Sequence, residues 1–210
     1  MSREIILEKV RSALGRSPGQ PPAEAPATRL RIPEVAVEER LDSFRRSLEA
    51  LAGKFYLASS REDARRYVAA LIEGRTAVAS NSPYLAECGI AGLPGVRTGF
   101  AREAELREAC ASAGAGVTSA DYALADTGTL VLLSSAREAR MVSLLPPLHV
   151  AVIPREIVLT TLDELLTLLP CPADATSSML LITGPSRTAD IEQILVRGVH
   201  GPGEVHVVVI

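Results

Sequence analysis

Aromatic residues are scarce in this 210-residue chain, and its basic residues do not outnumber its acidic ones. Aromatic side chains make up 3% of the residues and Trp is absent, so the core must consist of Leu, Val, Ile and Ala. Platforms on which nucleic-acid bases could stack are therefore not expected. The net charge of −3 also leaves no basic field to neutralise a phosphate backbone. Together these shortages argue against nucleic-acid binding.

Cysteine is equally rare, and its spacing excludes several classes of metal site. Cys88, Cys110 and Cys171 are far apart and form no C-x-x-C pair. This pattern excludes a cysteine-ligated iron–sulfur cluster or a zinc ribbon within the chain. It fits a reducing compartment better than a disulfide framework. We therefore expect neither a metal nor a resident cofactor in this chain, and three ordinary part-buried thiols.

Long hydrophobic runs are missing as well. The most apolar stretch, Met141 to Ile153, is interrupted by Pro146, Pro147 and His149, and it is shorter than the ~20 residues that a membrane span requires. Charged residues near the N-terminus interrupt any signal-peptide core. These features predict a cytoplasmic protein that does not enter the membrane.

The N-terminal region differs in composition from the rest. Residues 2–14 carry apolar side chains at helical spacing, which predicts an amphipathic helix. Residues 15–33 hold five prolines and predict an extended linker. We therefore divide the chain into a helix and Pro-rich linker at 1–33 and an α/β domain at 34–210. The helix either packs on its own domain or docks on a partner or second subunit, which would give a homo-oligomer through residues 2–14.

Helices and strands are predicted to alternate along the second region. Several of the strands are apolar on both faces, which is typical of a sheet covered on both sides. Alternation of this kind predicts an α/β fold with a parallel or mixed sheet in a three-layer sandwich. Helices are expected at 35–52, 61–73 and 103–113, and strands at 54–58, 76–80, 130–133, 150–153, 179–182 and 205–210.

The strongest local motif is Thr183-Gly-Pro-Ser-Arg-Thr188, between a predicted buried strand and a predicted helix. Gly184 permits close approach of a ligand, because it has no Cβ. The N-terminus of a helix attracts anions through its free N–H groups. Ser186, Arg187 and Thr188 add donors suited to a carboxylate or phosphate. One interpretation is therefore an anion site.

A second interpretation of the same motif is an ordinary helix start. Ser186 or Thr188 would then be the N-cap, and Asp190 and Glu192 would complement the helix dipole. The two acids would also weaken a bound anion. Both interpretations stay open on these residues alone.

Three further segments carry side chains capable of chemistry. Asp126-Thr127-Gly128-Thr129 fits a turn between strands, or a carboxylate beside two hydroxyls that polarises or positions a substrate. His149 opens an apolar strand, where it is either a structural residue or, if it faces a cleft, the best candidate for proton transfer near neutral pH. His200 lies at the tip of a Gly/Pro turn, and its spacing from His206 does not indicate a metal site.

Taken together and in this order, four segments resemble the lactate utilization protein C family, the stand-alone form of the LUD domain. The segments are Ala125–Thr129, Ser143–His149, Thr183–Glu192 and Gly198–Pro202. The resemblance implies a fold similar to the sugar-isomerase and coenzyme A transferase superfamily, a Rossmann-like three-layer α/β/α sandwich. It also implies a role in oxidising L-lactate to pyruvate with two iron–sulfur partner proteins. In the acid-Thr-Gly-Thr motif, Asp126 stands where Glu is expected, so its carboxylate reaches one methylene less.

These observations lead to three functional hypotheses. The first is a component of lactate oxidation that binds a small carboxylate or phosphate-bearing ligand. Its catalytic candidates are Asp126 and His149, and its ligand-binding candidates are Thr127, Gly128, Thr129, Thr183, Gly184, Ser186, Arg187, Thr188 and His200. The second is a free-standing transferase or isomerase acting on a coenzyme A or sugar-phosphate substrate, with Asp126 as nucleophile or base. The third is a non-catalytic interaction or regulatory subunit.

Overall fold

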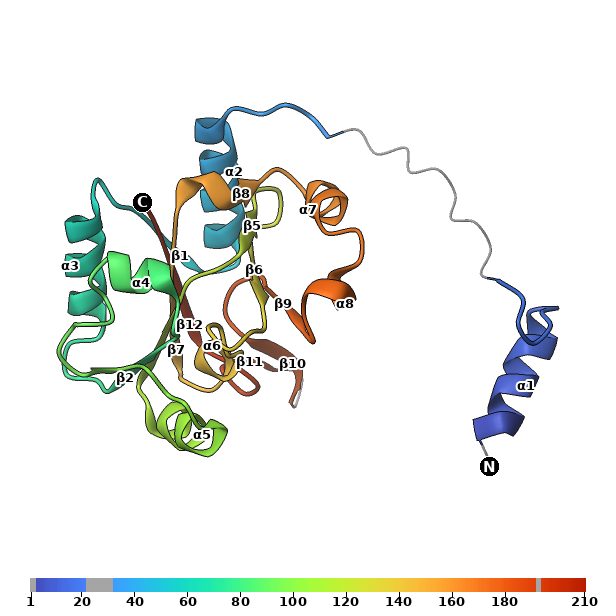
Figure 1. Ribbon diagram of the computed structural model, residues 1–210. Coiled ribbons are helices and arrows are strands. Elements are labelled where there is room, and N and C mark those ends of the chain that lie inside the picture. Colours follow the sequence, from blue (N-terminus) through green and yellow to red (C-terminus); the bar gives the residue numbers. More distant parts are fainter. Residues whose placement is uncertain (1–2, 22–31, 192–193) are drawn as a thin grey trace. The chain divides into compact units, whose positions relative to one another are not determined.

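The computed structural model describes residues 3–21, 32–191 and 194–210 (Figure 1). The chain divides into two units, residues 1–31 and 32–210. The first unit contains α1 (Arg3–Ala13), which confirms the predicted N-terminal helix. Ile6 and Val10 of α1 are each 49% exposed, so its apolar side chains contact little within their own unit. Of the predicted linker, residues 22–31 lie outside the described part of the chain.

The second unit is built on a parallel sheet. Its six strands follow the order β1-β12-β7-β4-β2-β3, and every adjacent pair is parallel. All six residues of the central strand β7 are buried, which explains its continuous apolar sequence. The strands are β1 (Lys54–Leu57), β2 (Ala77–Ala79), β3 (Val96–Arg97), β4 (Ala115–Thr118), β7 (Leu148–Ile153) and β12 (Glu204–Val209).

A second, mostly antiparallel sheet runs in the order β8-β5-β6-β9. Its strand β9 lies at the edge beside β6, and Leu181 of β9 is 44% exposed. The strand was expected to be buried, and this expectation is wrong because β9 has a neighbour on one side only. The strands are β5 (Tyr122–Leu124), β6 (Thr129–Leu133), β8 (Val158–Leu159) and β9 (Met179–Ile182).

Both faces of the parallel sheet are covered, as predicted, but by different elements. On one face, Val68 of α3 and Leu85 of α4 pack in a cluster with Val150 of β7. On the other, Phe44 of α2 packs with Leu130 of β6, so the second sheet shares this layer with helices. The expected layer of helices alone is therefore wrong on this side. The helices of this unit are α2 (Val37–Ala50), α3 (Arg61–Leu71), α4 (Pro83–Glu87), α5 (Glu103–Ser112), α6 (Met141–Leu144), the 3₁₀ turn η1 (Arg155–Ile157), α7 (Leu162–Leu168) and α8 (Pro172–Ala175).

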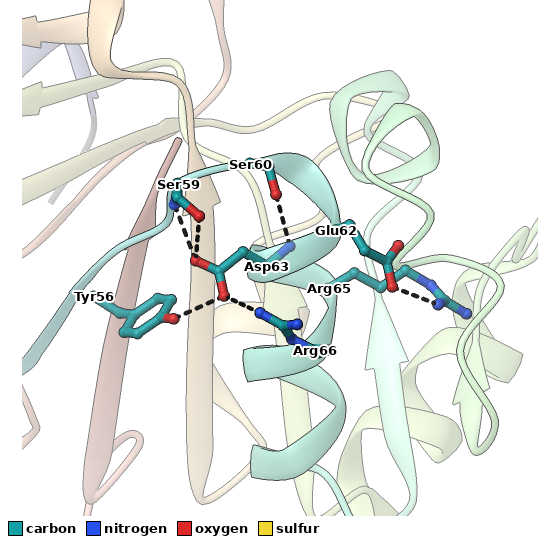
Figure 2. A network of polar contacts seen from close by, with 7 residues as sticks. All are labelled: Tyr56, Ser59, Ser60, Glu62, Asp63, Arg65 and Arg66. Atoms are coloured by element: carbon teal, nitrogen blue, oxygen red, sulfur yellow. Dashed lines mark hydrogen bonds and ion pairs between the residues drawn. The ribbon is translucent and has the colours of Figure 1, made fainter.

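A cluster of polar contacts around Asp63 fixes the start of α3 at the end of β1 (Figure 2). The Asp63 carboxylate accepts hydrogen bonds from the Ser59 nitrogen and hydroxyl, both at 3.0 Å. It also accepts from the Tyr56 hydroxyl at 3.0 Å and from Arg66 at 2.7 Å. The Ser60 hydroxyl accepts from the Asp63 nitrogen and caps the helix. These donors, led by the Ser59 N–H, lower the pKa of Asp63 well below its ordinary value.

The depressed pKa of Asp63 predicts a loss of stability in acid. Its contribution is present above the ordinary carboxyl pKa near 3.8 and is lost as the pH falls through the lower folded-state value. We expect Asp63→Asn to lower the urea midpoint at pH 7 and to flatten its decline between pH 4 and 2. Asp42→Asn, on the exposed face of α2, serves as the control. Parallel pH profiles for Asp63→Asn and the unmodified chain would contradict the assignment.

Among the helices of the described residues, none combines the length and the apolar character that a bilayer span requires.

Candidate functional site

A hollow of about 480 Å³ opens at the carboxyl ends of β2 and β4. The chain leaves β2 toward α4, on the face that holds Leu85, and leaves β4 toward β5, on the opposite face. Adjacent parallel strands whose connections diverge in this way leave a crevice in which ligands of α/β proteins usually bind. The crevice is lined by Ser82, Pro83, Ser119, Ala120, Asp121, Ser135, Ala136, Arg137 and Glu138.

Glu138 is the most unusual group in the crevice, because it is a carboxyl group that is only 8% exposed. One oxygen, Oε2, accepts a hydrogen bond from the Ser80 hydroxyl at 2.9 Å. The other, Oε1, is buried and has no hydrogen-bond partner among the described residues. Burial raises the pKa of Glu138 to about 8, and the nearby charge of Asp121 adds to the effect. Glu138 is therefore mainly protonated at neutral pH and can donate a hydrogen bond.

Asp121 supplies a second carboxyl group from the end of β4. Its Oδ2 accepts a hydrogen bond from the Leu133 nitrogen at 2.7 Å. Burial also raises the pKa of Asp121, while the hydrogen bond from Leu133 opposes that shift. The crevice thus combines two carboxyl groups in different surroundings, an arrangement that enzymes use to separate an acid from a base.

The loop after β6 presents Arg137 and Glu138 to the crevice. The Ser135 hydroxyl accepts hydrogen bonds from the Arg137 and Glu138 nitrogens, at 3.2 and 3.1 Å. The Asn81 nitrogen donates to the Arg137 carbonyl at 2.8 Å and ties this loop to the end of β2. These contacts fix the backbone of the loop that places Arg137 and Glu138 in the lining of the crevice, and a guanidinium group near a protonated acid suits a carboxylate.

The predicted turn at Asp126–Thr129 is confirmed as the turn between β5 and β6. Gly128 has φ +66°, and a Cβ there would lie 2.4 Å from the Leu48 nitrogen of α2. The glycine is therefore required by contact with the helix. Asp126 is exposed, and only its backbone makes hydrogen bonds among the described residues, to the Ser47 hydroxyl and the Thr160 carbonyl.

Three of the predicted hydroxyl groups meet across β6 and β9. The hydroxyl of Thr129 lies 2.8 Å from that of Thr127 and 2.9 Å from that of Thr183. Thr129 is buried, so its hydroxyl mainly serves as the hydrogen-bond partner of the other two hydroxyl groups. The structure thus brings Thr127, Thr129 and Thr183 together, whereas no contact joins them to His149 in the described part of the chain.

The helix expected after Thr188 is not formed, and this prediction is wrong. Residues Arg187–Ile191 form β10, which pairs with β11 (Ile194–Arg197) as an antiparallel hairpin. The anion site at a helix N-terminus therefore loses its basis, and so does the capping role of Ser186 or Thr188. Glu192 lies outside the described residues, and the Thr188 side chain is not among those described.

The remaining residues of this motif are held by neighbouring backbone. Gly184 has φ +81°, and a Cβ there would lie 3.1 Å from the Leu51 Cβ. Arg187 donates to the Leu51 carbonyl, beyond the end of α2. The Ser186 nitrogen donates to the Pro202 carbonyl at 2.8 Å, which joins the motif to the turn that carries the exposed His200. The glycine motifs at 128 and 184 thus both pack around the C-terminal end of α2.

His149 is fully buried in β7 and does not face the crevice. Its Nε2 lies 2.8 Å from the Thr118 hydroxyl, and its Nδ1 has no partner among the described residues. Burial lowers the pKa of His149 to about 4, so the ring is neutral at pH 7. The geometry favours the structural interpretation of this histidine over proton transfer.

Sequence reasoning missed the two acids of the crevice. Glu138 lies in the polar segment Ser134–Arg140, and charged residues in such a segment are normally exposed. Asp121 follows β4, whose small residues gave no strand signal. For Glu138 a usable signal was its position after the predicted strand at 130–133, because polar side chains collect where strands end.

Within residues 3–21, 32–191 and 194–210, no group of three or more His, Cys, Asp or Glu side chains is arranged to hold a metal ion. Cys88 and Cys110 are buried and Cys171 is exposed, all as free thiols.

Comparison with known proteins adds a family and a fold. Residues 41–210 match the family model described as the LUD domain. Lactate utilization protein C from Halalkalibacterium halodurans is 43% identical over 101 residues, which cover 46% of this chain and 44% of that protein. The chain therefore spans less than half the length of this relative in the alignment. Lactate utilization protein C from an Exiguobacterium strain is 29% identical over 100% of this chain and 96% of its own.

A solved structure supports the fold independently. A DUF162 family protein from Deinococcus radiodurans superposes with a TM-score of 0.62 at 18% sequence identity. The match covers 84% of this chain and 99% of that one, so the two chains share an α/β fold.

Proposed function

This chain belongs to the LUD domain family, and we propose that it serves in lactate utilization by binding a small hydroxycarboxylate in the crevice between β2 and β4. Relatives named lactate utilization protein C support the metabolic role. The observation that carries the binding role is the buried, mainly protonated Glu138 carboxyl group, which lines a hollow of about 480 Å³. That volume is in the usual range for small-molecule sites.

The crevice contains a complementary group for each polar part of a 2-hydroxy acid. The Arg137 guanidinium and the protonated Glu138 donate to the ligand carboxylate. The Asp121 carboxylate accepts from the ligand hydroxyl. A ligand that lacks the hydroxyl loses the hydrogen bond to Asp121, so L-lactate should bind more tightly than propionate.

The proposal extends to partners and location. Iron–sulfur partner proteins enter it through the family resemblance, because the chain's own cysteines are too dispersed to ligate a cluster. Three free thiols support a cytoplasmic location. We also propose that the parallel sheet is Rossmann-like, as in the sugar-isomerase and coenzyme A transferase superfamily; the ligand crevice at its carboxyl edge supports this likeness.

Calorimetric titration with L-lactate, pyruvate and propionate tests the binding role. We expect saturable binding of L-lactate to the unmodified chain and a loss of about 100-fold in Arg137→Ala, because a charge-assisted pair is removed from a partly enclosed site. Arg46→Ala, on the exposed face of α2, serves as the control and should bind normally. Equal affinities in Arg137→Ala and Arg46→Ala, or no binding of any of the three acids, would refute the assignment.

An acid–base enzyme is a second candidate, favoured by the pairing of Glu138 with Asp121. In this candidate the general acid is Glu138. Asp126, which the transferase or isomerase hypothesis took as nucleophile or base, is exposed and its side chain has no partner among the described residues. Turnover of a hydroxy acid by the isolated chain, abolished in both Glu138→Gln and Asp121→Asn, would distinguish this candidate from a binding component.

A further inference from the structure

Ser80 directly follows β2 and is buried, with only 4% of the residue exposed. It does not line the crevice itself. Its nitrogen donates to the Val117 carbonyl of β4 at 2.9 Å, and its carbonyl accepts from the Thr98 hydroxyl at 3.3 Å. Because neighbouring segments hold the Ser80 backbone on both sides, its side chain starts from a fixed position.

The Ser80 hydroxyl donates a 2.9 Å hydrogen bond to Oε2 of Glu138, whose backbone is also held in place. The Glu138 nitrogen donates to the Ser135 hydroxyl at 3.1 Å, and the carbonyl of the preceding Arg137 accepts from the Asn81 nitrogen at 2.8 Å. Ser80 and Glu138 are both buried, and a hydrogen bond between fixed groups away from water is stronger than one at the surface. The pair therefore joins the end of β2 firmly to the loop after β6.

This hydrogen bond favours the ionised form of Glu138, because a hydroxyl donates more strongly to a carboxylate than to a neutral acid. Burial raises the pKa of Glu138 most, the bond from Ser80 lowers it, and the charge of Asp121 raises it again, to about 8 in all. Ser80 at the end of β2, Asp121 after β4 and Arg137 on the same loop are the polar groups around Glu138 from these three segments. Ser80 thus opposes burial and brings the ionisation of Glu138 closer to neutral pH.

We infer that Ser80 is a positioning residue that sets the alkaline limit of ligand binding in the crevice. This role rests on the proposed function, because it requires that the crevice binds a carboxylate. An ionised Glu138 repels a carboxylate ligand, so the crevice keeps its ligand only while Glu138 keeps its proton. Ser80 acts through Glu138 and makes the release of that proton easier. A rise in pH therefore empties the crevice sooner than it would without the Ser80 hydroxyl.

Titration of Glu138 without ligand tests the link between the two residues. In carboxyl-carbon NMR spectra of the chain labelled on its Glu side chains, the signal that is missing from Glu138→Gln belongs to Glu138. We expect its midpoint at about pH 8 in the unmodified chain and about one pH unit higher in Ser80→Ala, because a bond to the ionised form is lost. Ser80→Thr keeps the donor and should restore the midpoint. Ser112→Ala, which removes an exposed hydroxyl at the end of α5, is the control. An equal midpoint in Ser80→Ala and Ser112→Ala would overturn the inference.

Calorimetric titration with L-lactate at about pH 7 and about pH 9 tests the effect on binding. The affinity at the higher pH, relative to that at the lower, should be about fivefold greater in Ser80→Ala than in the unmodified chain, because about half rather than a tenth of Glu138 keeps its proton. A purely structural Ser80 would lower the affinity equally at both pH values and leave this ratio unchanged. In a Glu138→Gln background, Ser80→Ala should not alter the ratio, because no carboxyl group remains at this position to titrate.

Failure of the proposed function has a different signature from failure of the role of Ser80. Absence of L-lactate binding at every pH would refute the proposed function and the alkaline limit with it. Binding of L-lactate with the same affinity ratio in Ser80→Ala and the unmodified chain would overturn only the role of Ser80.

Discussion

Gly116→Ala is expected to destabilise the chain by about 3 kcal/mol or more, since the new methyl group has no space. A Cβ on Gly116 of β4 would lie 1.9 Å from the Val142 carbonyl oxygen and 3.1 Å from the Pro146 ring. The Val142 carbonyl belongs to the backbone of α6, so it cannot rotate away as a side chain would. The helix must move as a unit or β4 must leave the sheet.

Differential scanning calorimetry measures the effect. For a chain of this length the loss corresponds to a fall in melting temperature of roughly 10 °C. Gly92→Ala is the matched control, because the nearest atom to a Cβ at that position is 3.9 Å away. A Gly116→Ala variant that melts within two degrees of Gly92→Ala would show that α6 does not rest on β4 in this way.

Glu138→Gln is expected to remove a decline of stability with rising pH. The folded-state pKa of about 8 is above the ordinary value near 4.5, so the folded chain holds a proton that the unfolded chain releases. The stability associated with the protonated group is complete below about pH 4.5 and is lost as the pH rises through 8. Between these limits the slope approaches 1.4 kcal/mol per pH unit.

Urea denaturation from pH 5 to 9 checks this slope. Gln is neutral at every pH and can still accept the Ser80 hydrogen bond, so Glu138→Gln should become more stable than the unmodified chain above neutral pH. Glu108→Gln on exposed α5 should follow the unmodified chain. Binding of L-lactate should weaken above pH 8 as Glu138 ionises and repels the ligand carboxylate. Identical stability slopes in both variants would contradict the burial of a protonated acid.

Periodicity and composition predicted the parallel sheet and most of its elements correctly. The apolar runs of β7 and β12 and the amphipathic segments of α2, α3 and α5 were identified, because their side chains follow the geometry of a strand or helix. Strand β4 was missed, because its Gly116 is typical of a turn and is present only to admit the α6 backbone. The need for glycine at this position arises from contact with Val142, 26 residues later, so the residues around Gly116 do not reveal it.

At 187–197 a helix was predicted where the chain forms a β-hairpin. Acidic residues after Thr188 and the apolar residues that follow fit the start of a helix, yet the segment forms β10 and β11. Strand pairing across the hairpin outweighs this weak local preference. The sequence marks the glycine motifs at 128 and 184, whose glycines contact α2, whereas the burial of Glu138 depends on the complete fold and could not be predicted locally.

The pairing of β1 with β12 has a consequence for how the chain acquires its fold during synthesis. β1 ends at Leu57 and lies at the edge of the parallel sheet, where its neighbour β12 begins only at Glu204. At about 5–20 residues per second, a ribosome takes roughly seven to thirty seconds to produce the intervening segment. During that time β1 has no strand to pair with, and the Leu51 carbonyl lacks the hydrogen bond that Arg187 donates in the folded chain. The nascent chain therefore completes the parallel sheet only after β12 has emerged, and chaperones that shield β1 until then should increase the yield of folded protein.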